Sequence, residues 1–95
     1  MNHQTEEIMT ILQEECAEVI TSISKCRRFG LHTLVPFTET KETNMSRLSK
    51  ELGDVLAMID LLVEQKLVTN QELEEYKQSK IEKLKKWSNI KINKK

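Results

Sequence analysis

The sequence predicts an all-α protein with three helices in each protomer, and three features indicate this fold class. Two glycines and one proline in 95 residues leave few positions that break a helix. Aromatic residues make up 4% of the chain and charged residues 32%, a balance that favours helices over a sheet. Apolar residues recur with the period of a helix face in three segments. Because such a short chain has little core of its own, we expect it to pair with copies of itself.

The first predicted helix runs from about Thr5 to Arg28. Thr5 suits an N-cap because Glu6 and Glu7 follow it at the positive end of the helix dipole. Gly30 is expected to end the helix in a left-handed conformation. At about 100° per residue, the apolar positions form one stripe. The stripe consists of Ile8, Ile11, Leu12, Val19, Ile23 and Cys26.

A long loop and two further helices follow. The loop contains Pro36 and the polar run TETKETN, and its length of about 13 residues is typical of a functional or mobile segment. The second helix is expected from about Asn44 to Lys66, and its apolar positions cover more than half of the circumference. The third begins at Thr69, which forms a capping box with Glu72, and continues to about Ser88. Since only two or three residues link these two helices, they are expected to form an antiparallel hairpin.

Charge and hydropathy exclude several classes of protein. Fifteen basic and fifteen acidic residues give a net charge of zero, so nothing global indicates nucleic acid or an anionic membrane as a partner. No apolar run approaches the ~18 residues of a membrane span, and the N-terminus lacks the pattern of a signal peptide. A cytoplasmic protein of one domain, residues 1–95, is expected, with 89–95 as a basic C-terminal tail. The cluster KLKKW is interpreted as a solvated helix end.

Four carboxylates interrupt the apolar faces of the first two helices. Glu15 lies near the middle of the first stripe, and Glu18 lies three residues later at its edge, so the two are neighbours. Glu51 and Asp54 repeat this spacing at one border of the second apolar arc. Burying paired carboxylates is unfavourable unless a cation compensates them. If the helices pack face to face, four hard oxygen ligands converge, which suits Mg²⁺ or Mn²⁺ rather than zinc.

Other forms of chemistry fit these residues less well. A di-iron bundle needs Glu-x-x-His motifs, and neither His3 nor His32 follows a Glu at that spacing. Cys16 and Cys26 are about 15 Å apart along one helix, too far for a disulfide, and are interpreted as buried, reduced thiols. Glu14 points about 100° away from Glu15 and is interpreted as a rim residue rather than a catalytic base.

The stretches EECAE, residues 14–18, and ELGD, residues 51–54, resemble the EExxE and ExxD motifs of the MazG-like, all-α nucleoside triphosphate pyrophosphohydrolases. The resemblance extends over roughly residues 8–86 as an order of helices. It implies that magnesium is held by the catalytic carboxylates Glu15, Glu18, Glu51 and Asp54. It also implies hydrolysis of the α–β phosphoanhydride of a nucleotide to monophosphate and pyrophosphate, in a dimeric or tetrameric assembly of the four-helix-bundle type.

Candidate phosphate ligands come from two helices. Lys77 and Lys80 fall inside the apolar stripe of the third helix, where a triphosphate would supply a counter-charge. The alternative is that both lysines snorkel along apolar surface. Lys25 lies seven residues after Glu18 on nearly the same face, with Ser22 between them, so a phosphate or a base could reach both.

Three functions remain open at this stage. The first is a Mg²⁺-dependent pyrophosphohydrolase of a (deoxy)nucleoside triphosphate, and the second is a related enzyme similar to phosphoribosyl-ATP pyrophosphatase. The third is a non-enzymatic helical interaction module whose acidic seams bind basic residues of a partner. The base, the sugar, the number of metal ions and the choice between cellular housecleaning and a phage role in the dNTP pool stay open.

Overall fold

The computed structural model describes residues 1–39 and 41–92, and this part of the chain contains three α-helices and no strand. They are α1, His3–Phe29; α2, Asn44–Glu64; and α3, Asn70–Trp87. The prediction of an all-α, three-helix chain is confirmed. The last three residues of the expected basic tail, 93–95, lie outside the described residues.

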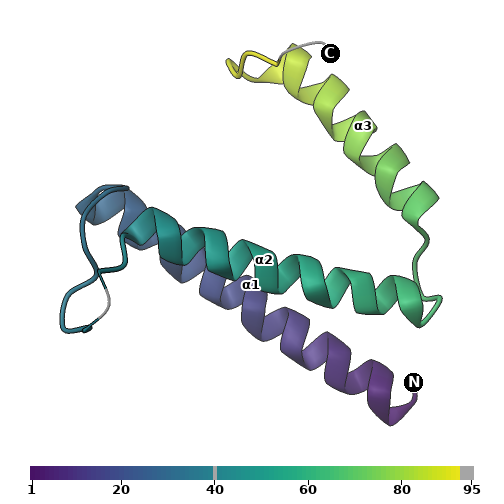
Figure 1. The fold of residues 1–95 in the computed structure, drawn as a ribbon. Helices are drawn as coiled ribbons and strands as arrows, with labels where there is room; N and C mark the ends of the chain where they lie inside the picture. The colour runs from purple at the N-terminus through teal and green to yellow at the C-terminus, as the bar shows by residue number, and fades with distance from the viewer. Residues whose placement is uncertain (40, 93–95) are drawn as a thin grey trace.

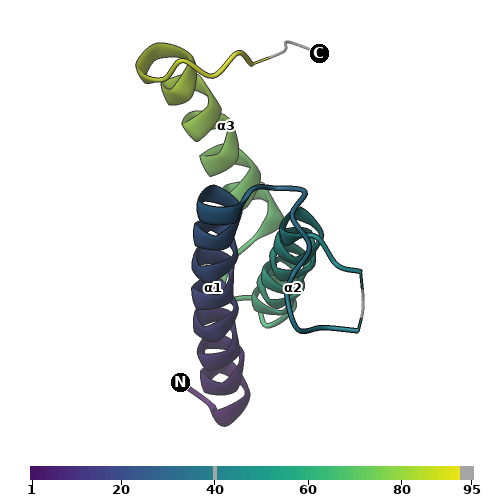
Figure 2. The ribbon, with the colours of Figure 1, turned by 90° about the vertical axis from the view of Figure 1, so that its left-hand side faces the viewer.

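α1 and α2 form an antiparallel pair, and α3 projects away from it (Figure 1). Figure 2 shows the same arrangement after a rotation of 90°, with α1 beside α2 and α3 extending beyond the pair. The predicted hairpin of the second and third helices is therefore wrong, because α3 makes almost no contact with either of the other helices. None of the helices in the described part is long and apolar enough to cross a membrane.

The turn after α2 explains why α3 leaves the pair. Lys66 adopts a positive φ of 61°, and its backbone N–H donates to the Val63 carbonyl at 2.9 Å. The Leu67 N–H donates to the Leu62 carbonyl at 3.1 Å, which completes a Schellman motif. Thr69 then follows in an extended conformation, so the chain is directed outward rather than back along α2.

The start of α1 differs from the prediction, and its end agrees. Asn2 rather than Thr5 is the N-cap, because the Asn2 side chain accepts a hydrogen bond from the Thr5 N–H at 2.8 Å. The N-cap therefore lies three residues earlier than expected. Gly30 ends the helix with a φ of +102°, and its N–H donates to the Cys26 carbonyl at 3.0 Å. A left-handed backbone at this position favours glycine, as expected.

Side chains cap the other two helices. Thr43 caps α2 by accepting a hydrogen bond from the Ser46 N–H at 3.0 Å. The predicted capping box of α3 is confirmed, since the Glu72 N–H donates to Thr69 Oγ1 at 3.1 Å and the Thr69 N–H donates to the Glu72 carboxylate at 2.8 Å.

Few side chains are buried in the protomer. Ile8 and Cys26 are the buried apolar residues of the described part, and both lie in the stripe predicted for the first helix. Cys16 is exposed, so its interpretation as a buried thiol is wrong, although both cysteines are free as expected. Leu56 on α2 is 62% exposed. The wide apolar arc of α2 is therefore only partly covered by α1.

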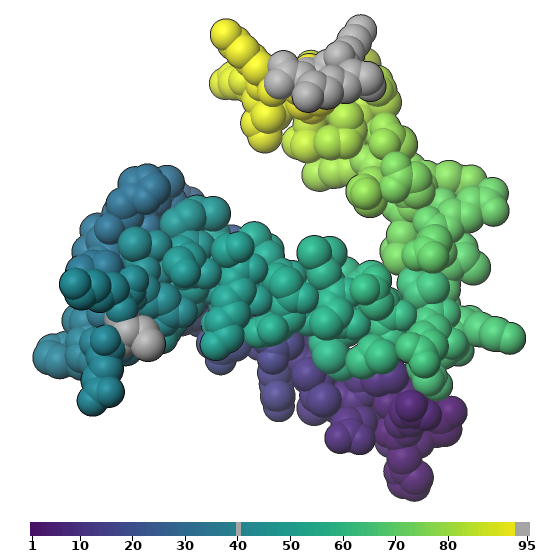
Figure 3. All heavy atoms as spheres, viewed as in Figure 1, coloured from purple at the N-terminus to yellow at the C-terminus, as the bar shows by residue number. Residues whose placement is uncertain are grey.

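The protomer exposes more surface than a compact chain of its size. Its accessible surface is 8113 Å², whereas a compact monomer of 11.1 kDa exposes about 5,700 Å². The radius of gyration is 16.4 Å, against about 12 Å for a compact domain of this length. Figure 3 shows the open space between α3 and the α1–α2 pair. No residue of α3 is buried, and its aromatic residues Tyr76 and Trp87 are exposed.

Hydrogen bonds hold the described residues of the loop, 30–39 and 41–43, together and against the start of α2. The Val35 N–H donates to the Glu42 carbonyl at 2.7 Å, and an antiparallel bridge joins Leu34 and Thr43. The Arg47 guanidinium forms an ion pair with the Glu42 carboxylate at 3.2 Å. The loop thus forms one wall of a cavity beside the end of α1 and the start of α2.

Candidate metal centre

The packing of α1 against α2 brings together three carboxylates from separate parts of the sequence. Glu15 comes from the middle of α1, and Glu51 and Asp54 lie one turn apart on α2. One carboxylate oxygen from each residue lies within 4.8 Å of the other two. The three-residue spacing of Glu51 and Asp54 on α2 therefore places both of these carboxylates opposite Glu15.

The electrostatics of this cluster disfavour three negative charges without a cation. Partial burial is the largest cause that raises the pKa of Glu15 above its ordinary value. The negative charges of Asp54 and Glu51 raise this pKa further, as do a hydrogen bond with Asp54 and the charge of Glu18. Among the described residues, no lysine or arginine forms an ion pair with the cluster. A set of hard oxygen ligands with uncompensated charge fits a divalent cation such as Mg²⁺.

Glu18 lies outside this group of three. Its side chain is exposed, one turn after Glu15 on α1, which agrees with its expected position at the edge of the stripe. Its charge still acts on the Glu15 carboxyl. Glu14 is also exposed, as a rim residue would be. The structure therefore brings together three of the four predicted metal ligands and places the fourth at the border of the cluster.

The sequence matches the profile of the MazG nucleotide pyrophosphohydrolase domain over residues 3–89. The chain belongs to this family. Membership implies a hydrolase of the nucleotide pyrophosphohydrolase family with a nucleotide substrate, and the acidic cluster is consistent with the divalent metal site typical of a MazG domain. Neither the curated proteins nor the solved structures gave a match.

The two lysines predicted on the third helix lie away from the acidic cluster of this MazG domain. Lys77 pairs with Glu74 at 3.1 Å, and both side chains are exposed. Lys80 is also exposed. Because α3 makes almost no contact with α1 or α2, neither lysine approaches the cluster of its own protomer.

The other two candidates lie near the C-terminal end of α1. Ser22 is buried, and Lys25 lines a cavity of about 400 Å³ beside the loop. The other residues that line this cavity, among them Phe29, Asn44 and Arg47, were not predicted as site residues. Arg47 could have been found from its position four residues before Glu51, since that spacing places both on one face of α2. Asn44 was interpreted only as the start of a helix.

Proposed function

We propose that this MazG domain is a Mg²⁺-dependent pyrophosphohydrolase that cleaves the α–β phosphoanhydride of a (deoxy)nucleoside triphosphate to monophosphate and pyrophosphate. The observation that carries the proposal is the convergence of Glu15, Glu51 and Asp54, with oxygens within 4.8 Å, in a chain of this family. Hard carboxylate oxygens favour Mg²⁺, and Mn²⁺ is the alternative ion.

The carboxylates have two tasks in this reaction. Glu15, Glu51 and Asp54 would hold the cation, and Glu18 would join them by turning its exposed side chain toward the cluster. Bound Mg²⁺ supplies charge neutralisation at the phosphate oxygens and a lower pKa for the attacking water. The oxygen of that water bonds to one phosphorus, and the bridging oxygen leaves with the other phosphate. A carboxylate of the cluster accepts the proton of the water.

The proposed assembly is a homodimer or a dimer of dimers of four-helix-bundle type, in which residues 1–95 act as one domain. Its support is the excess of roughly 2,400 Å² of exposed surface over a compact monomer, since stable homodimer interfaces bury about 2,000 Å² or more. In such an assembly α3 of one protomer would lie against another protomer. Lys80 and Lys77 would then contact the phosphates from the partner subunit.

A substrate screen tests the proposed reaction. The common ribo- and deoxyribonucleoside triphosphates and phosphoribosyl-ATP are incubated with the full chain and Mg²⁺ or Mn²⁺, and released pyrophosphate is measured. We expect pyrophosphate and a nucleoside monophosphate from at least one triphosphate. Pyrophosphate from phosphoribosyl-ATP alone would replace the proposed substrate class. Release of orthophosphate and a diphosphate would contradict cleavage at the α–β bond, and no product from any substrate would favour the interaction module.

A further inference from the structure

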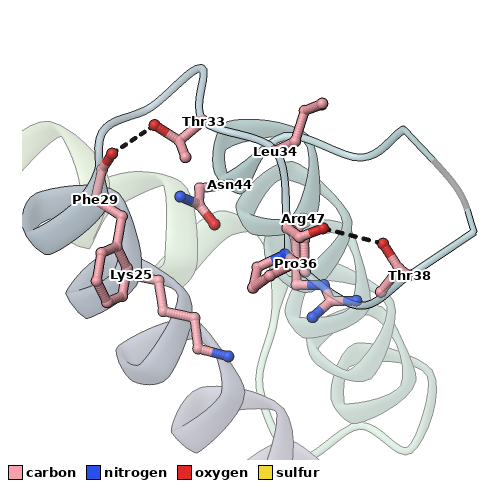
Figure 4. A pocket seen from close by; sticks show the side chains of 9 residues that line it. Lys25, Phe29, Thr33, Leu34, Pro36, Thr38, Asn44 and Arg47 are labelled. Carbon is pink, nitrogen blue, oxygen red and sulfur yellow. Dashed lines mark hydrogen bonds between the residues drawn. The ribbon is translucent and has the colours of Figure 1, made fainter.

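We propose that the cavity between the end of α1, the loop and the start of α2 binds the base of the nucleotide. This inference rests on the proposed function for the identity of the ligand. The cavity has a volume of about 400 Å³, within the roughly 300 to 1,000 Å³ of small-molecule sites. Figure 4 shows its walls, which come from both helices and from the loop.

The walls offer flat apolar surface together with a few polar groups. Phe29, Leu34, Val35 and Pro36 supply the apolar part. Phe29 is 55% exposed although it is aromatic, so a ring stacked on it would remove apolar surface from water. Aromatic side chains bind bases in this way because every base has a π face. A planar heterocycle with polar edges therefore fits this lining better than an aliphatic ligand.

Asn44 presents a hydrogen-bond acceptor to the cavity. The residue is only 5% exposed, and its Nδ2 donates to the Gly30 carbonyl at 2.9 Å. That bond assigns the amide, because a carbonyl can accept only from the nitrogen. Its Oδ1 has no hydrogen-bond partner among the described residues. Every fully enclosed side-chain oxygen or nitrogen of those residues has a partner. The Oδ1 atom is therefore not fully enclosed and remains open to the cavity. In Figure 4 the oxygen points toward the space between Lys25 and Pro36.

The Oδ1 atom of the buried Asn44 side chain can accept a hydrogen bond from a donor group on the ligand. An unpaired polar atom at such a site loses the hydrogen bonds it would make in water. Bases carry amino or ring N–H donors on their edges, and these can reach Asn44 while the ring lies against Phe29. The structure therefore assigns the two groups complementary tasks, with stacking by Phe29 and edge recognition by Asn44.

The cavity and the acidic cluster share one seam between α1 and α2. Arg47 precedes Glu51 by four residues, about 6 Å along the axis, and Lys25 follows Glu18 by seven, about 10 Å. Arg47 is already paired with Glu42, whereas Lys25 has no ion-pair partner among the described residues. A nucleotide with its base in the cavity would thus extend its phosphates past Lys25 toward the cluster.

Nuclear magnetic resonance tests the cavity without any turnover. Nucleosides and nucleoside monophosphates are titrated into the ¹⁵N-labelled full chain in the absence of metal. We expect shifts of the Asn44 side-chain amide and of the Thr33 and Val35 backbone amides, with at least one base preferred. Phe29→Ala should weaken this binding about tenfold or more through loss of stacking. Phe37→Ala is the matched control, because Phe37 lies in the same loop, is 105% exposed and does not line the cavity.

A kinetic comparison separates this inference from the proposed function. Phe29→Ala should raise KM for the preferred triphosphate about tenfold, whereas the control Phe37→Ala, which changes a residue outside the cavity, should leave KM unchanged. Wild-type turnover without any shift at Asn44 and without an effect of Phe29→Ala would overturn the base site and leave the proposed reaction intact. Shifts at Asn44 weakened by Phe29→Ala, in a chain that hydrolyses no triphosphate, would support the base site and contradict the proposed reaction.

Discussion

Different sequence features account for the α1–α2 pair and for α3. α3 carries its own helix signals, a capping box and exposed pairs such as Lys77 with Glu74 at 3.1 Å, and it forms without packing on the rest of the protomer. In contrast, the seam between α1 and α2 contains groups that helix propensity does not explain, above all Glu15 among apolar neighbours. Local signals thus predict where a helix forms, whereas carboxylates between packed helices indicate where the chemistry lies.

The largest effect should come from the cluster itself. Glu15→Gln, Glu51→Gln or Asp54→Asn each removes a ligand charge that nothing else in the described part replaces, so each should abolish pyrophosphate release. Glu18→Gln should do the same if its side chain completes the set. Asp60→Asn is the control, since Asp60 is an exposed carboxylate of α2 outside the cluster, and it should retain wild-type activity. Near-wild-type turnover in any cluster variant would remove that residue from the metal site.

Metal binding should stabilise the packing of α1 against α2 and should have no effect on the helix α3. At a Mg²⁺ concentration of 100 times Kd, binding to the folded state alone adds about 2.7 kcal/mol to the free energy of unfolding. Tm should therefore rise by several degrees with Mg²⁺ or Mn²⁺ and return after addition of EDTA. Glu51→Gln should lose most of this rise. An unchanged Tm in the wild-type chain would instead support an interaction module.

Much of the helical structure could be predicted because its signals are local. Thr43, Thr69 and Glu72 act as caps where the sequence indicates a helix start. Asn2 was missed because Thr5 is also a favoured N-cap type and is followed by Glu6 and Glu7 at the positive end of the helix dipole. The direction of α3 was missed because it depends on Lys66 in a left-handed conformation, which lysine adopts without a sequence signal such as glycine or asparagine.

The convergence of the three carboxylates was predictable to a similar extent. The spacing of Glu51 and Asp54 placed them on one face of a helix, and an apolar stripe around Glu15 indicated the opposing face. The cavity was not predictable in this way. Its shape depends on the path of the loop, which follows from backbone bonds such as that from the Asn44 N–H to the Thr33 carbonyl at 3.0 Å. No periodicity in the sequence encodes that path.

The lysines of α3 test whether this helix takes part in the site of a partner subunit. If α3 completes the site of a partner subunit, Lys80→Met should lower kcat/KM about ten- to hundredfold, the loss of one charge-assisted phosphate contact. Lys77→Met should have a smaller effect, because Lys77 already pairs with Glu74 in an exposed position. Metal affinity should not change in either variant. Light scattering should show a dimer or tetramer, and a fully active monomer would contradict any role of α3 in a partner's site.

The smallest expected effect is a dependence of stability on pH in the metal-free chain. The pKa of Glu15 is raised in the fold, by partial burial first and then by the charges of Asp54 and Glu51, so the folded state binds a proton more tightly than the unfolded state does. Protonation of Glu15 thus contributes stability that is fully present below its unfolded pKa of about 4.5 and is lost as pH rises through the raised value. Thermal unfolding is measured at pH values from about 4.5 upward through the raised pKa of Glu15. Tm should fall with rising pH more steeply in the wild-type chain than in Glu15→Gln, which carries no titrating group at this position.

Saturating Mg²⁺ should reverse this dependence of Tm on pH, because ligands must be deprotonated to bind metal and the complex gains stability as pH rises. If Glu15→Gln and the wild-type chain follow the same metal-free curve, the three carboxylates do not share the charge that their geometry indicates.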